Sequence, residues 1–250
     1  MNTAAAAMAT WMAAGLCVGA AMAPVSTRAA DDGNGPGSLL PFEASYTFLY
    51  KGMTAGVTTL TLSRGDGGRW SYRSSGEARG IFRMLPIDNP TQNSEMRVTA
   101  GGVQPLSFSQ RNGKSDERAV ELRFDWDANR VQGTIEKKPV GEAVPPDTQD
   151  DLSVQIALIT AMARGQDSGT LHTYGDRGLR EYRYHADGEE MLHTAIGDVQ
   201  TRMFVTERPD SPRVTRYWCA PSLGYLPLRV QQKRLDDVEW TLEVRTLKRG

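Results

Sequence analysis

Few residues in this chain could do acid–base, nucleophilic or metal chemistry. The three histidines, His172, His185 and His193, are separated by thirteen and eight residues, a spacing that matches no compact metal motif. Cys219 follows two aromatic residues in a strand-like segment without a base nearby in the sequence, which favours a packing role over a nucleophilic one. We therefore predict no catalytic residue, no metal ligand and no cofactor.

The sequence also lacks motifs that bind phosphates or activate a serine. It has no Gly-x-Ser-x-Gly elbow before a helix, no phosphate loop and no dinucleotide-type glycine cluster. Asp147, Asp150 and Asp151 precede a segment of helical periodicity, where carboxylates stabilise the positive end of a helix dipole. The net charge is −1 and basic residues form no long cluster, so nucleic acid is not expected as a partner. A hydrolase would need acids and a histidine from distant strands to converge, and it stays an alternative.

The elements that must position these side chains are mainly β-strands. Val120, Leu122, Phe124 and Trp126 alternate with polar residues, as in a strand with one face in a core. Turn-forming pairs such as Asn112-Gly113 separate such runs and predict antiparallel pairing. We expect a mainly β fold of about twelve strands, either a single curved antiparallel sheet or an open or closed β-barrel-like meander. Thirteen segments are candidates, one of them surplus: 43–50, 55–63, 69–78, 92–99, 104–111, 117–126, 130–137, 178–186, 189–195, 198–207, 213–219, 226–234 and 237–248.

One segment, 151–164, has the period of an α-helix. Leu152, Ile156, Ile159 and Ala163 stand at offsets of four, seven and eleven residues and form one apolar stripe. A lone amphipathic helix in a β-rich chain has to bury its stripe. We therefore expect it to pack on the concave side of the sheet.

The N-terminal residues have the composition of an export signal. No charged residue occurs between Ala4 and Ala23, and Thr27-Arg28-Ala29 supplies small residues at the −3 and −1 positions of a signal-peptidase site. The pattern predicts a signal peptide over 1–29, a flexible linker over 30–39, a single β-rich domain over 40–250, and a location in the periplasm. Cleavage would leave no stable membrane span. There are two alternatives: the segment is retained as a membrane anchor, or Cys17 is lipidated.

An apolar run at 81–87 is too irregular for a clean strand. It is either an ordinary packed loop or the rim of an apolar cavity or docking site. Because a curved sheet has one concave side, this run and the helix stripe are expected to meet there. The candidate ligand-binding residues are Ile81, Phe82, Met84, Leu85, Ile156 and Ile159.

Several segments carry a family resemblance. They are Leu40 to Tyr46, Gly52 to Gly56, the helix start at Asp151, Tyr217 to Pro221, and Gly224 to Val230. These segments resemble the periplasmic proteobacterial family called domain of unknown function 3108, over most of residues 40–248. The resemblance implies an exported, β-rich single domain and brings no established catalytic set.

These observations favour an exported, non-enzymatic periplasmic protein that binds an apolar, lipid-like ligand or an envelope partner. The alternatives are a structural or assembly factor of the cell envelope acting through its surface, and an uncharacterised hydrolase. A continuous apolar interior would favour carriage of a ligand. An interior filled by side chains would favour action through the surface.

Overall fold

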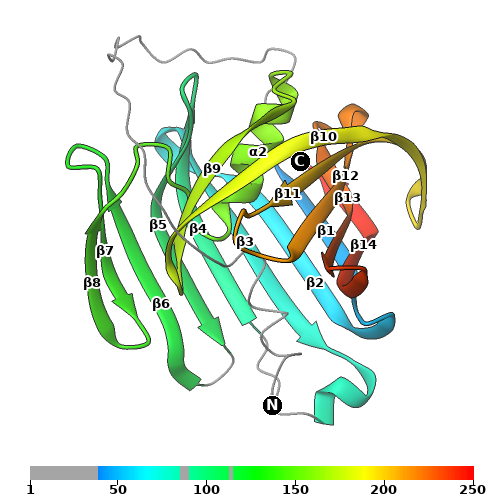
Figure 1. Ribbon diagram of the computed structural model, residues 1–250, viewed down its shortest axis with the longest axis horizontal. Coiled ribbons are helices and arrows are strands. Elements are labelled where there is room, and N and C mark those ends of the chain that lie inside the picture. Colours follow the sequence, from blue (N-terminus) through cyan, green and yellow to red (C-terminus); the bar gives the residue numbers. More distant parts are fainter. Residues whose placement is uncertain (1–38, 85–89, 113–114) are drawn as a thin grey trace.

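The structure is a computed structural model that describes residues 39–84, 90–112 and 115–250. Strands dominate it, with one α-helix and three short 3-10 helices among the described residues (Figure 1). The helices are η1 (Asp66–Gly68), η2 (Gly80–Met84), α2 (Ser153–Ala163) and η3 (Pro221–Leu223). The strands are β1 (Phe42–Tyr50), β2 (Met53–Arg64), β3 (Arg69–Ala78), β4 (Pro90–Thr99), β5 (Gly102–Asn112), β6 (Ser115–Asp125), β7 (Arg130–Ile135), β8 (Lys138–Ala143), β9 (Ser168–Gly175), β10 (Gly178–Thr194), β11 (Gly197–Glu207), β12 (Arg213–Ala220), β13 (Leu226–Arg234) and β14 (Asp237–Arg249).

All described strands form one antiparallel sheet of 14 strands. Its order is β8-β7-β6-β5-β4-β3-β2-β1-β14-β13-β12-β11-β10-β9, so two meanders join where the first strand pairs with the last. The sheet stays open between β8 and β9, and α2 connects these two edge strands along the chain. The predicted mainly β, antiparallel and barrel-like architecture is confirmed.

The expected strand segments differ from the observed strands at three places. Segments 178–186 and 189–195 form the single strand β10, because the turn-like pair Asp187-Gly188 lies in a bulge within it. Strands β8 and β9 were not expected. They are the edge strands, and β8 shows no alternation because it buries none of its residues.

Alternating burial places the core on the concave face of the sheet. In β1, Phe42, Ala44, Tyr46 and Phe48 are buried while the residues between them are exposed or half-buried. β6 repeats this pattern with Val120, Leu122 and Phe124. The inner faces of both meanders therefore contribute to one continuous core.

Helix α2 lies inside the curl of the sheet. In Figure 1, β9 and β10 pass on one side of it and β1 to β4 on the other. Eight of its residues are buried, so burial extends well beyond the expected stripe: Ser153, Val154, Gln155, Ile156, Leu158, Ile159, Thr160 and Met162. Tyr72 of β3 donates a hydrogen bond to Gln155 (2.9 Å), and Arg164 donates to the carbonyl of Thr99 (2.9 Å). The helix therefore occupies the interior of the curled sheet and is buried on most of its surface, instead of packing through one apolar stripe.

The meander sends alternate turns to opposite ends of the sheet. One end carries the β1–β2 turn, η2 between β3 and β4, and the β13–β14 turn, and η2 projects from it at the bottom of the view (Figure 1). We call this group of three segments the η2 end. Helix α2 finishes at the other end, because Arg164 reaches the β4–β5 turn.

Candidate functional site

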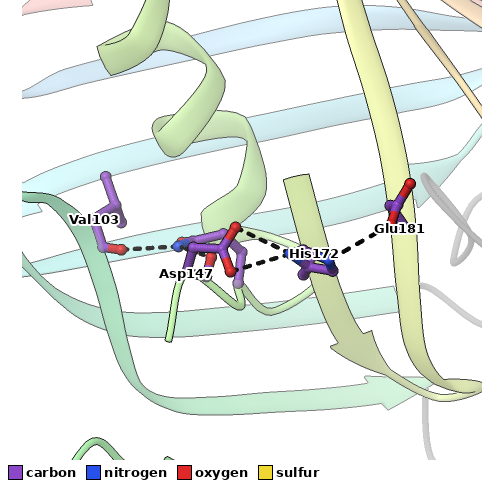
Figure 2. A network of polar contacts seen from close by, with 5 residues as sticks. Val103, Asp147, His172 and Glu181 are labelled. Carbon is purple, nitrogen blue, oxygen red and sulfur yellow. Dashed lines mark hydrogen bonds and ion pairs between the residues drawn. The ribbon is translucent and has the colours of Figure 1, made fainter. Parts of the chain in front are cut away.

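The three acids before α2 could have formed a catalytic centre, and His172 is the histidine nearest to them. Its Nδ1 lies 3.0 Å from the Asp147 carboxylate, and its Nε2 lies 3.8 Å from Glu181 on the neighbouring strand (Figure 2). The hydrogen bond and the negative charge of Asp147 raise the pKa of His172 despite its partial burial. Burial opposes the ionisation of Asp147, but the hydrogen bond and charge of His172 lower its pKa overall. Both ring nitrogens face carboxylates, so neither is placed to take a proton from a nucleophile.

This network anchors the segment before α2 to the edge strand β9. Gln149 donates its backbone N–H to the carbonyl of His172 (2.8 Å) and accepts the N–H of Tyr174 (2.8 Å), as an added parallel strand would. Its side-chain amide donates to the carbonyl of Val103 on β5 (2.8 Å; Figure 2). The segment with Asp147 and Gln149 therefore covers part of the β9 edge, which would otherwise be unpaired, and its polar contacts have a structural role.

Asp150 fixes the beginning of α2. Its carboxylate accepts the N–H groups of Leu152 (2.8 Å) and Ser153 (2.7 Å) and the hydroxyl of Ser94 (2.6 Å). The Ser153 hydroxyl in turn accepts the N–H of Asp150 (2.9 Å), a reciprocal cap of the helix N-terminus. Burial raises the pKa of Asp150 to about 6, although these hydrogen bonds favour the carboxylate.

Asp151 is a second buried carboxyl group beside the first. Burial, helped by the charge of Asp176, raises the pKa of Asp151 to about 7, while the positive charge of Arg180 acts in the opposite direction. The carboxyl group lies directly over Gly175, where any side chain larger than hydrogen would overlap it. Both acids are therefore enclosed by their own chain, as in a structural polar core rather than an open cleft.

Cys219 is fully buried, and burial raises the pKa of its thiol well above the ordinary value. A thiol of this kind is a poor nucleophile. Among the described residues, no group of three or more His, Cys, Asp and Glu side chains could hold a metal ion.

Replacement of Cys219 by alanine should therefore cost only packing, about 1 kcal/mol of unfolding free energy. Chemical denaturation of the variant would measure this loss. The wild-type thiol should also resist alkylation until the protein unfolds. Rapid alkylation of the folded protein would contradict the packing role.

A groove of about 590 Å³ opens between residues 192–195 and strands β1, β13 and β14. Two of the polar side chains that line it have partners within the chain: Arg229 pairs with Glu243 (3.0 Å), and His193 contacts Asp198 (2.7 Å). Beside it, the β10–β11 hairpin covers Trp218, whose indole N–H donates to Glu190 (2.9 Å). These contacts hold the hairpin on the sheet.

The η2 end carries the most unusual surface of the described chain. Six large apolar side chains are exposed among the described residues, and four of them lie at this end. Their exposed fractions are 52 % for Met53, 68 % for Ile81, 87 % for Met84 and 75 % for Leu235. Exposed apolar side chains gathered in one region are typical of a binding surface.

Basic side chains stand among these apolar residues. Arg79 and Arg83 flank Ile81 within η2 and its approach, and Lys51 lies in the adjacent β1–β2 turn. All three are exposed. At η2 and the β1–β2 turn the surface therefore combines apolar tips with positive charge, whereas the β13–β14 turn carries the exposed acids Asp236 and Asp237 beside Leu235.

The structure separates the candidate residues predicted from the sequence. Ile81 and Met84 are exposed on η2, and Phe82 turns inward and is buried between them. Ile156 and Ile159 are buried in α2, inside the sheet. Leu85 lies outside the described residues.

Met53, Leu235 and the three basic residues were not among the sequence-based candidates. They come together because a meander places alternate turns at the same end. The order of the turns in the sequence predicts this grouping. In an antiparallel meander, every second hairpin turn lies at the same end of the sheet, as the β1–β2, β3–β4 and β13–β14 turns do here.

Fold and surface together define an open, β-barrel-like domain wound around one buried helix. The family model for proteins of unknown function DUF3108 matches residues 42–242, and the chain belongs to that family. No protein of curated function matches the sequence. Among the described residues, no helix is long and apolar enough to cross a membrane.

Two solved structures resemble this fold at low sequence identity. A β-barrel-like protein of the DUF1849 domain from Brucella abortus aligns with a TM-score of 0.57 and 10% identity, over 85% of this chain and 98% of that one. A protein with a YmcC-like fold from Bacteroides fragilis aligns with a TM-score of 0.39 and 11% identity, over 83% of this chain and 95% of that one. The first likeness supports the fold alone.

Proposed function

We propose that the protein is exported to the periplasm and acts without catalysis, binding an apolar component of the cell envelope through its η2 end. The observation that carries this proposal is the grouping of Met53, Ile81, Met84 and Leu235 at one end of the sheet. Leaving large apolar side chains in water costs free energy that burial against a partner would recover. Export rests on the composition of residues 1–29.

The interior supports binding at the surface over carriage inside the sheet. Helix α2 already occupies the concave side, with Ile156 and Ile159 buried. The interior also holds polar side chains that are hydrogen-bonded to each other, which is not the purely apolar lining that an acyl chain requires. They include Gln92 with Gln110 (2.7 Å), and Trp240 with Gln232 (3.0 Å).

The polar groups most suited to catalysis have other tasks. Asp150 caps α2, Asp151 is enclosed against Gly175, and His172 is held between two carboxylates. This arrangement supports a binding function over hydrolysis, which needs an accessible acid and base in one cleft.

Site-specific photo-crosslinking in living cells tests this proposal. A photoreactive amino acid at Met84 should form covalent products with an envelope component, because this side chain is the most exposed apolar group at the η2 end. The same amino acid at Met191, which is also exposed but lies on the β10–β11 hairpin, should not form these products. Mass spectrometry of protein recovered from the periplasmic fraction would identify them.

A second change sharpens the crosslinking test. Ile81→Ser should weaken the Met84 products while altering the unfolding free energy by less than about 0.5 kcal/mol, because Ile81 is exposed. Identical products at both positions, or absence of the protein from the periplasmic fraction, would contradict the proposal.

A further inference from the structure

We propose that the envelope component bound by the η2 end is the surface of a lipid bilayer that contains anionic headgroups. This inference rests on the proposed function and names its partner. It follows from the combination of protruding apolar tips with basic side chains, the chemistry by which proteins bind to the interface of an anionic membrane without spanning it.

The apolar tips lie on neighbouring turns. Backbone contacts dock η2 against the start of β2, where Arg79 donates its N–H to the carbonyl of Ala55 (2.8 Å), close to Met53. Strand β1 lies between β2 and β14 in the sheet. The β13–β14 turn with Leu235 is therefore the neighbour of the β1–β2 turn at the same end of the sheet. Met53, Ile81, Met84 and Leu235 therefore form a row of tips rather than isolated exposed residues.

Phe82 makes the central part of this row rigid. Its side chain is buried in the core, which fixes η2 while Ile81 and Met84 on either side of it remain exposed. A membrane anchor needs apolar groups presented outward on a fixed support, because ordering a loose loop would cost conformational entropy on binding.

Leu235 adds an independent sign of function. It has a positive φ of 56°, a conformation that glycine or asparagine adopts more easily than leucine, and its side chain is 75 % exposed. Neither the backbone conformation nor the exposure of this leucine favours the folded state. Penetration into an apolar phase would give the side chain a favourable environment.

The charges around the tips favour an anionic surface. Lys51, Arg79 and Arg83 are exposed near η2, and Glu77 lies 3.9 Å from Arg79. That contact is long and exposed, so it neutralises Arg79 weakly. The β13–β14 turn does not add to this positive charge, because exposed Asp236 and Asp237 lie beside Leu235 and offset Arg234. The basic side chains are therefore concentrated at η2 and the β1–β2 turn.

Vesicle sedimentation with the purified protein tests this inference. The wild type should bind vesicles of mixed phosphatidylglycerol and phosphatidylcholine, should bind pure phosphatidylcholine weakly, and should be released by salt. Arg79→Gln with Arg83→Gln should lower the affinity by about tenfold or more. Ile81→Asn with Met84→Asn should lower it to a similar extent, because burial of these two side chains is lost.

Matched controls exist at other parts of the sheet. Arg69→Gln with Arg97→Gln removes two exposed arginines that face each other across β3 and β4 at the opposite end. Met191→Asn removes one exposed methionine from the β10–β11 hairpin. Both variants should bind the anionic vesicles like the wild type. Circular dichroism melting would verify that every variant is folded.

The outcomes separate this inference from the function on which it rests. Equal loss of binding in the control variants, or full binding by the η2 variants, would overturn the lipid assignment. Absence of vesicle binding together with Met84-specific crosslinks to a protein would also overturn it, while the proposed function would stand. Absence of both would refute both.

Discussion

Replacement of Ile156 by aspartate is expected to unfold the domain. Ile156 is fully buried in α2, and α2 fills the interior of the curled sheet. The change removes apolar contacts worth about 2–5 kcal/mol and places a carboxylate where no partner is prepared for it. The total loss approaches the whole stability of a typical domain, about 5–15 kcal/mol.

Circular dichroism and chemical denaturation would measure this effect. Two variants provide the comparison. Ile156→Val should cost only about 1 kcal/mol. Ile81→Asp makes the same replacement of isoleucine by aspartate at an exposed position and should leave the unfolding free energy nearly unchanged. Cooperative, wild-type-like unfolding of the Ile156→Asp protein would show that α2 is not essential to the core.

The unfolding free energy is expected to fall as the pH rises from about 4 to about 7. Burial raises the pKa of Asp150 to about 6 and that of Asp151 to about 7, from an ordinary value of 3.8. In this range the folded protein holds protons that the unfolded chain has released, so increasing pH favours unfolding. The shift of Asp150 alone corresponds to about 3 kcal/mol, and the shift of Asp151 adds to it in the same direction.

Two substitutions test which residues cause the fall of the unfolding free energy with increasing pH. Asp151→Asn has no proton to lose, so the variant should gain stability relative to the wild type as the pH rises towards 8. Asp147→Asn should behave differently, because the pKa of Asp147 is lowered and that of its partner His172 is raised. It should lose most stability between the two pKa values, where both partners are charged, and less above the pKa of His172.

Denaturant titrations at several pH values would make this comparison. A constant difference between the wild type and Asp151→Asn from pH 4 to pH 8 would mean that Asp151 titrates as an ordinary exposed acid. In that case the carboxyl group would not be enclosed against Gly175.

The sequence by itself determined the fold class and most strand positions. Alternation such as Val120, Leu122 and Phe124 depends on a local geometric rule, since successive side chains of a strand point to opposite faces. It also located α2 and Asp150, the acid that caps it, because helical periodicity and N-terminal carboxylates are local signals as well. Buried residues of the predicted stripe, such as Ile156 and Ile159, follow from the same rule.

Only the tertiary structure decided features that depend on distant residues. Strands β8 and β9 lack regular alternation because β8 buries none of its residues and the last three residues of β9 are all buried. Helix α2 is buried on most of its surface because the sheet curls around it. The expected meeting of the 81–87 run with the helix stripe depended on which end each would occupy, and the structure places Ile81 and Met84 on η2 and Ile156 within the core. Local patterns specify which residues are apolar. The order of strands in the sheet decides which of them share an end, and whether they face the core or the solvent.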